Sequence, residues 1–208
     1  MHTQPGGSPV LTEQRLELLR HAALSFGASL DLAEVLSEVL REAQAVLAAG
    51  SWAVWLLESD GSILTCWRAS APRSDGLEGY QVTVDRGILG QAVRDGMVIY
   101  SPDLHSDPRY DREIGAHAEI PPAALICCPL VVGSRETETY ATIGAVSVVS
   151  DRVCAFKPED VAVVCALTAS AATAIHNARL YDQAQQELTR RRQVEDALRQ
   201  RQDRKSVV

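Results

Sequence analysis

Five cysteines are the residues in this chain best suited to chemistry, because a thiolate can act as a nucleophile or bind a metal ion. Their number is odd, none forms a CxxC pair, and most lie in apolar runs, which is typical of reduced, buried thiols in an intracellular protein. Cys127 and Cys128 are neighbours on an expected strand, so their side chains point to opposite faces and cannot readily bind one metal ion together. We therefore predict structural thiols at Cys66, Cys127, Cys128, Cys154 and Cys165.

Polar and aromatic residues near an irregular stretch at 102–122 form a second group of candidates. Small-molecule sites combine apolar walls with a few polar anchors. Arg68 is one of few basic residues in an acidic body, so it could hold an anionic ligand, but it could also pair with a nearby carboxylate and face water. We expect any ligand to lie between the sheet and residues 100–118, in contact with Trp67, Arg68, Tyr100, Asp103, Tyr110 and His117.

The sequence contains no P-loop, no HExxH motif and no Ser-His-Asp order, which are the motifs that would indicate common hydrolases and nucleotide-dependent enzymes. A lone histidine such as His117, with no partner to orient its ring, is weak evidence for a ligated metal or haem. We therefore predict that the chain by itself is not an enzyme and holds no metal ion.

The elements that must position these residues follow from hydrophobic periodicity and turn signals. Helical spacing and turn residues predict helices at 11–26, 31–48, 87–94 and from 157 towards the end of the chain. Residues 102–122 have no clean period, and we expect a loop there with one short helix around 110–118. Apolar, β-branched runs predict strands at 52–57, 62–69, 80–84, 97–101, 123–132 and 141–150. Six strands without regular βα alternation indicate an antiparallel sheet in an α+β domain. The strand at 52–57 is apolar on both faces, so we expect both faces of the sheet to be covered, by core packing on each side or by helices on one side and a ligand-binding cap on the other.

Length and charge limit the classes of function. The chain has 208 residues, 46% hydrophobic and 23% charged, which is enough for one domain with extensions. The net charge of −7 argues against nucleic acid or an anionic membrane as a partner. The start has no signal-peptide pattern and the apolar run at 161–175 is short for a membrane span, so we expect a cytoplasmic protein without membrane insertion.

Several segments, taken in their order along the chain, resemble the GAF domain family. They are GILGQAV at 87–93 with Gly96, YSPD at 100–103 with DPRY at 107–110, LICCPL at 125–130, IGAV at 143–146, FKPED at 156–160 and NARLY at 177–181. The resemblance covers roughly residues 15–181. It implies a six-stranded antiparallel sheet with a helical layer on one face and a ligand site on the other.

The domain boundaries expected from this resemblance are a disordered start at 1–10, a GAF domain at 11–181 and a coiled-coil signalling linker at 182–208. The last segment is a distinct kind of sequence, because from Arg179 onwards eight Lys and Arg residues outnumber five Asp and Glu residues. Its heptad pattern is interrupted between Leu188 and Val194.

The cofactors known in relatives are each disfavoured, and the ligand stays unknown. Haem-binding relatives use a histidine ahead of the fifth strand; His117 lies in that neighbourhood without a matching motif. Bilin-binding relatives carry a cysteine on the cap, and residues 107–122 contain none. Cyclic-nucleotide-binding relatives have Asn-Lys before the pattern Phe-x3-Asp-Glu; here Phe156 and Asp160 match, but the other positions do not.

The resemblance implies a sensory module that binds a small molecule, forms a homodimer through its N- and C-terminal helices, and passes a signal to an output domain in cis or in trans. A ligand-free dimerisation scaffold is the alternative. Reduction of free methionine sulfoxide, an enzyme activity within the family, is a third interpretation; it needs thiols on loops over the pocket, and only Cys154 lies on an expected loop.

Overall fold

The computed structural model describes residues 9–28, 32–47, 49–70, 77–116, 121–134 and 139–206. The chain divides into two compact units, Met1–Ala174 and Ile175–Val208. Of the start predicted to be disordered, 1–10, residues 1–8 lie outside the described residues, as does the candidate His117, whereas residues 9 and 10 are helical.

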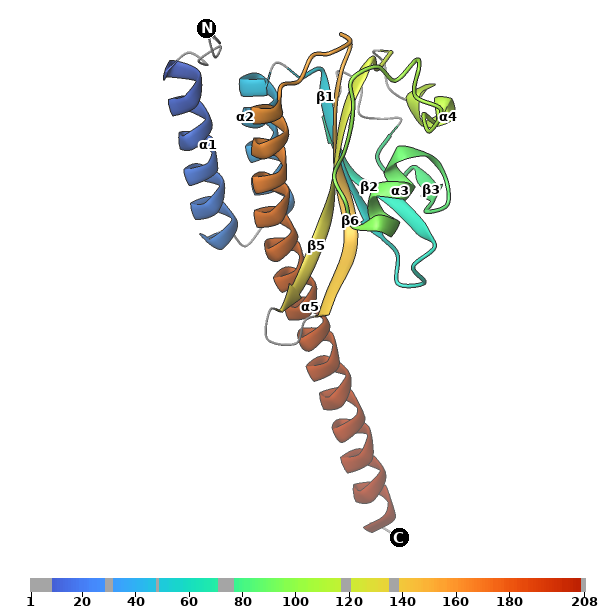
Figure 1. Ribbon diagram of the computed structural model, residues 1–208. Helices are drawn as coiled ribbons and strands as arrows, with labels where there is room; N and C mark the ends of the chain where they lie inside the picture. The colour runs from blue at the N-terminus through green and yellow to red at the C-terminus, as the bar shows by residue number, and fades with distance from the viewer. Residues whose placement is uncertain are drawn as a thin grey trace, which may run out of the picture. The chain divides into compact units, whose positions relative to one another are not determined.

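The first unit is built on one sheet of six antiparallel strands in the order β3-β2-β1-β6-β5-β4 (Figure 1). The strands are β1 (Ser51–Leu57), β2 (Ile63–Ser70), β3 (Gln81–Thr83), β4 (Ile99–Ser101), β5 (Ala124–Ser134) and β6 (Thr139–Ser150). The predicted fold class is therefore confirmed. The β1–β2 hairpin turns at Gly61, whose φ of 74° is a conformation that glycine adopts at little cost.

Helices lie on both faces of this sheet (Figure 1). On one face lie α2 (Leu32–Leu47) and the first part of α5 (Pro158–Ser206), with α1 (Pro9–Ala28) packed against α2. Trp52 of β1 faces this layer and meets Leu40 and Leu167 around a gap of about 10 Å³. The helical layer is therefore closely packed, as expected for a hydrophobic core.

The opposite face is covered by a cap, which we define as residues 84–116 with the short helices α3 (Gly87–Asp95) and α4 (Arg112–Ala116). Ala53 and Trp55 of β1 point to this side, in alternation with Trp52 and Val54. The buried cap-side cluster also contains Leu64, Cys66, Ile88, Leu89, Leu104 and Cys127. The prediction that both faces are covered is thus confirmed, because the two apolar faces of β1 have separate partners.

A buried carboxylate connects α1 to the first turn of α5. Asp160 is 5% exposed, and one of its oxygens accepts a hydrogen bond from the backbone N–H of Lys157 at 2.7 Å. Its other oxygen pairs with the guanidinium of Arg15 on α1. Asp160 therefore both caps the helix and neutralises a cation, so it has a structural role at the position where a resemblance to nucleotide-binding relatives was noted.

The predicted elements agree with the observed ones to within about two residues, including the strand expected to begin at Met97. The strand β4 begins at Ile99 instead. Gly96 caps the end of α3, and the side chains of Met97 and Val98, which follow it, are 66% and 41% exposed. The left-handed backbone of Gly96, with φ of 62°, turns the chain out of the helix before it can join the sheet.

The second unit is the continuation of α5 from Ile175 to Ser206. Along it, Gln185 donates a hydrogen bond to the hydroxyl of Tyr181, and Arg191 pairs with Glu187 at 2.9 Å. These are bonds within one helix at i,i+4 spacing, which stabilise an exposed helix by a few tenths of a kcal/mol each. The coiled coil expected at 182–208 stays a prediction.

One stretch of α5, Pro158–Tyr181, is long and apolar enough to cross a membrane when judged by length and composition alone. Its 24 residues have a mean hydropathy of 1.5, so the apolar segment is longer than the 161–175 run considered from the sequence. Within the first unit, Val164, Leu167 and Ala171 of this stretch are buried. A core helix of a folded domain meets the same criteria, so length and composition alone do not make this stretch a membrane span.

An apolar cavity under the cap

A cavity of about 100 Å³ lies between the sheet and the cap. Its floor is formed by cap-facing residues of the central strands, including Ala53, Trp55 and Cys127. Its roof is formed by aliphatic side chains of the cap, which are Ile88, Leu89, Leu104 and Ile114. A mostly apolar pocket of this kind, with a few polar groups in its lining, can bind small molecules that are largely apolar.

One glycine, Gly90, allows α3 to lie close to the sheet edge and thereby fixes the roof. A Cβ atom on Gly90 would overlap the carbonyl oxygen of Val84 and lie 2.7 Å from its carbon. The backbone of the helix can therefore approach the preceding strand end only where a side chain is absent. Ile88 and Leu89, which flank this contact, are 3% and 6% exposed and point into the core.

Polar groups on the floor of the cavity are already hydrogen-bonded to the protein. The indole N–H of Trp55 donates to the Ser147 hydroxyl at 3.0 Å. The Ser70 hydroxyl accepts from the backbone N–H of Trp52 at 3.2 Å and donates to the Gln44 side chain at 2.9 Å. A hydroxyl has a further lone pair, so each serine can still accept a bond from a ligand.

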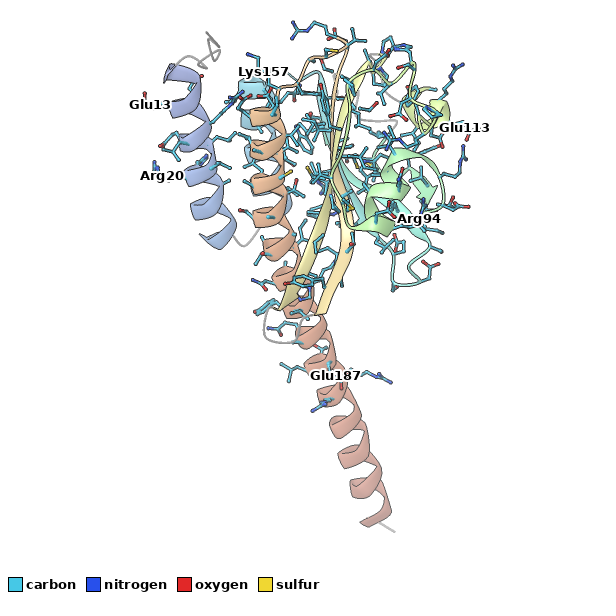
Figure 2. All side chains as sticks on the ribbon, viewed as in Figure 1. Glu13, Arg20, Arg94, Glu113, Lys157 and Glu187 are labelled. Carbon is cyan, nitrogen blue, oxygen red and sulfur yellow. The ribbon has the colours of Figure 1, made fainter. Side chains whose placement is uncertain are left out.

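The one carboxylate on the described lining, Asp111, is held by a cation. Its side chain is 10% exposed and lies 2.9 Å from the guanidinium of Arg86, which also pairs with Glu113 at 2.7 Å. Figure 2 shows Glu113 on α4, on the side of the domain away from the helical layer. Arg86 offsets one of these two carboxylate charges, and Glu113 is exposed to water, so Asp111 adds little uncompensated charge to the cavity itself.

Tyr110 closes one side of the cavity against α4. Its hydroxyl lies over Gly115, where a Cβ atom would overlap the ring and oxygen of the tyrosine. Burial raises the pKa of the Tyr110 phenol. The phenol therefore stays neutral and is a hydrogen-bond donor or acceptor rather than an anion.

Asp107 stabilises the turn that places Tyr110 beside the cavity. This carboxylate accepts hydrogen bonds from the backbone N–H of Arg109 at 3.0 Å and from its guanidinium at 2.9 and 2.7 Å. The bonds from the Arg109 side chain hold the pKa of Asp107 well below its ordinary value. The charged form of Asp107 thus stabilises the folded turn.

We expect Asp107→Asn to destabilise the protein by about 1 kcal/mol near neutral pH, because a bidentate, charge-assisted pair is lost. The pKa of Asp107 is lower in the folded than in the unfolded state, so its contribution is present above about pH 4 and declines as the pH falls below that value. Urea denaturation of both proteins at several pH values measures this difference. A gap that stays constant down to about pH 2 would contradict the charge-based explanation.

Residues 29–176 match the sequence profile described as GAF domain. The chain belongs to the GAF domain family. Its fold also resembles solved GAF domains from the phosphoenolpyruvate-protein phosphotransferases of Coxiella burnetii and Acinetobacter. The first has a TM-score of 0.69 and 17% identity, over 82% of this chain and 97% of that one. The second has a TM-score of 0.65 and 13% identity, over 81% and 97%.

The free methionine-R-sulfoxide reductase of Neisseria meningitidis, solved with its substrate, is similar to the same degree. The TM-score is 0.67 at 17% identity, and the match covers 87% of this chain and 99% of the reductase. At such identities the likeness shows the shared GAF fold alone.

Of the six residues predicted to contact a ligand, the structure brings Tyr110 to the cavity of this GAF domain. Residues of the 100–118 stretch cover part of the cavity, and α3 adds Ile88 and Leu89 to its roof. Whether a ligand lies there stays a prediction. His117 lies outside the described residues. The role of all six in binding stays a prediction.

The other four predicted residues lie away from the cavity lining. Arg68 stacks over the Trp67 ring, 5.4 Å from its centroid, and lies 3.9 Å from the Glu78 carboxylate. This matches the competing interpretation of a surface pair. Tyr100 donates a hydrogen bond to the carbonyl of Phe156 at 2.9 Å, and Asp103 accepts one from the backbone of His105.

The thiols of the GAF domain are separated as the alternation on β5 predicts. Cys127 lies in the cap-side cluster, while the Cys128 sulfur lies 3.3 Å from that of Cys165 on α5. The sequence analysis placed Cys128 and Cys165 on different elements without recognising this contact. Within the described residues, no group of three or more His, Cys, Asp or Glu side chains is arranged to hold a metal ion.

The lining residues that sequence analysis missed include the apolar side chains of the roof and floor and, among the polar ones, the serines of the floor and Asp111. Ser147 lies opposite Ala53, and Ser51 is two residues before Ala53 on β1. Both serines are therefore on the face of the sheet that is turned to the cap, where they line the cavity. The alternation of faces along a strand is a signal that was present in the sequence. Asp111 directly follows the DPRY segment and could have been included with Tyr110.

Proposed function

We propose that this GAF domain is a sensory module whose cavity binds a small, uncharged and largely apolar molecule. The observation that carries the proposal is the cavity itself, since about 100 Å³ remains between the cap and the sheet. A domain used only as a dimerisation scaffold has no need of such a space, and well-packed interiors contain few voids larger than a water molecule.

The lining chemistry supports the choice of ligand class. No lysine or arginine side chain lines the cavity within the part of the chain described here, and Asp111 is paired with Arg86. An anionic ligand would have to lose its hydration without a countercharge, which is costly. The hydroxyls of Ser147 and Tyr110 suit one or two polar atoms of a neutral ligand.

We propose further that the domain is not catalytic by itself, although a reductase shares its fold. The buried thiols of the cap-side cluster are Cys66 and Cys127, and burial raises the pKa of each to about 12. A thiol with such a pKa is almost entirely protonated near neutral pH and is a poor nucleophile.

Signal output is the remaining part of the proposal. The helix α5 is continuous from the sheet-packed region to Ser206, so it offers a covalent route from the domain to an output module. We propose a cytoplasmic homodimer formed through α1, α2 and α5, in line with the expected linker at 182–208. Light scattering that finds a monomer at tens of micromolar would contradict this arrangement.

The ligand class is tested by methyl NMR with a panel of small probes of similar size. We expect neutral probes such as indole and phenol to shift the methyl signals of Ile88, Leu89 and Leu104, and we expect benzoate and phenyl phosphate to leave them unchanged. In Ala53→Leu, whose added carbons enter the cavity, the affinity for indole should fall at least tenfold, which is about 1.4 kcal/mol.

Arg68→Ala is the matched control, because it removes a cation of the same sheet that lies outside the lining. It should leave indole affinity unchanged. Binding of benzoate but not indole, with loss of binding in Arg68→Ala, would show that the ligand site is the one first expected around Arg68 and would overturn the proposal. Native mass spectrometry of the protein from its own host can then identify a retained ligand.

A further inference from the structure

Two cysteines from distant parts of the chain meet between the sheet and the helical layer. Cys128 lies on β5 and Cys165 on α5, and their sulfur atoms are 3.3 Å apart. A disulfide has an S–S bond of about 2.05 Å, so the two atoms need to approach by only about 1.3 Å. Both residues belong to the first unit and both are free thiols.

The two thiols have unequal environments. Cys128 is 1% exposed, whereas Cys165 lies at the border of the helix face and is partly exposed. Either sulfur can donate the hydrogen bond that joins them. This contact lowers the pKa of the more exposed Cys165 and, together with burial, raises the pKa of Cys128. The accessible sulfur is therefore the one with more thiolate character, and the buried sulfur is the one that keeps its proton.

We propose that Cys128 and Cys165 form a redox site that a peroxide converts into a disulfide joining β5 to α5. This site is separate from the cavity under the cap, because Cys128 points to the opposite face of the sheet from Cys127. The proposal therefore does not depend on what the cavity binds.

The chemistry proceeds in two balanced steps. The Cys165 thiolate attacks hydrogen peroxide, breaks the O–O bond, and yields a sulfenic acid and hydroxide. The Cys128 sulfur then attacks the Cys165 sulfur; the S–O bond breaks, the proton of Cys128 joins the leaving oxygen, and water departs. In total, two thiols and one hydrogen peroxide give one disulfide and two waters, and a dithiol reverses the change.

The bond would tie a strand next to the centre of the sheet to the helix that leaves the domain. In the reduced state, α5 is held at this point by packing and a weak thiol hydrogen bond. In the oxidised state, the same contact is covalent, so sliding or rotation of α5 against β5 would be restricted. This gives the helix a second input that is independent of a bound ligand.

Oxidation of the full chain by a small excess of hydrogen peroxide tests the proposal. We expect the intact mass to fall by two hydrogen atoms and the number of alkylatable thiols to fall by two, with both changes reversed by dithiothreitol. Trypsin leaves Cys127 and Cys128 together on residues 113–135, and it leaves Cys154 and Cys165 together on residues 153–179. We expect a disulfide that links these two peptides. Because each peptide contains two cysteines, single-residue variants are needed to show which two sulfur atoms form the bond.

The linked peptide pair should persist in Cys127→Ala and in Cys154→Ser, and it should disappear in Cys165→Ser and in Cys128→Ala. Cys165 is partly exposed, so we expect the Cys165→Ser protein to fold, and circular dichroism checks that it does. This variant alone can then decide the test if the Cys128→Ala protein is unstable. Cys154 is exposed and serves as an internal control for oxidant exposure. The proposal is overturned if Cys154 is oxidised without any linked peptide, or if the link survives in Cys165→Ser.

Discussion

Replacing Gly144 by alanine is expected to destabilise the protein by about 3 kcal/mol or more, enough to unfold a domain of ordinary stability in part. Gly144 lies in the middle of β6, opposite Leu56 of β1 and Leu130 of β5. A Cβ atom there would overlap the carbonyl oxygen of Trp55 and lie 3.0 Å from the Leu56 Cα atom. These are backbone atoms of a central strand, so the clash can be relieved only by separating β1 from β6.

Gly50→Ala is the matched control for this change. It adds the same methyl group near the start of the same strand pair, but the new Cβ would meet its nearest atom, the Val149 carbonyl oxygen, at 3.4 Å. The hydrogen bond from the Gly50 N–H to that oxygen, 2.8 Å long, is kept. Thermal and urea unfolding should show a change within about 1 kcal/mol of the parent. Similar losses in both variants would refute the close approach at Gly144.

Trp55→Ala should cost about 3–5 kcal/mol in the free energy of unfolding. The side chain is 2% exposed, packs in the cap-side cluster and lines the cavity, so its removal enlarges an existing space instead of opening a new one. It also deprives the Ser147 hydroxyl of the indole N–H that now donates to it. Chemical denaturation monitored by far-ultraviolet circular dichroism measures the loss.

Trp55→Phe separates the two contributions. It keeps most of the ring in place and removes the hydrogen bond to Ser147, so we expect a smaller loss of about 1 kcal/mol. If Trp55→Ala cost no more than Trp55→Phe, the cap would have closed onto the sheet, and the cavity would be a feature the domain can lose without penalty.

The helices and strands could be predicted because each leaves a local pattern. The double-sided apolar run of β1 indicated a sheet covered on both faces, and the structure separates those faces as Trp52 against α2 and α5, and Trp55 against the cap. Asp-Gly is a common two-residue hairpin turn, so Asp60-Gly61 between two apolar runs predicts the hairpin that pairs β1 with β2. The placement of β6 beside β1, some 90 residues away, has no local signal and depends on how the whole core packs.

The candidate site could be predicted only in outline. Tyr110 was found because it belongs to the DPRY turn that the cap is built on, and Arg68 was weighed because its charge stands out in an acidic body. Periodicity does not show that Glu78 lies within 3.9 Å of Arg68. For Tyr100, the three-residue strand β4 is too short for alternation to show which face its side chain takes.

The contact between Cys128 and Cys165 could not be predicted for a related reason. Strand alternation correctly separated Cys128 from Cys127. It could not show which residue of which helix lies opposite, because the register of α5 on the sheet is set by many apolar side chains of nearly equal size, such as Val163, Val164 and Leu167.

The ion pair between Arg15 and Asp160 bears on where the stable domain begins. A chain shortened to the matched range, 29–176, would keep all six strands and every residue that lines the cavity, but it would lose α1 and with it Arg15. Asp160 would remain in the first turn of α5 without its countercharge, at a cost of about 1.5–3 kcal/mol. We therefore expect a chain that includes α1 to be more stable than one that begins at residue 29, where the family match begins.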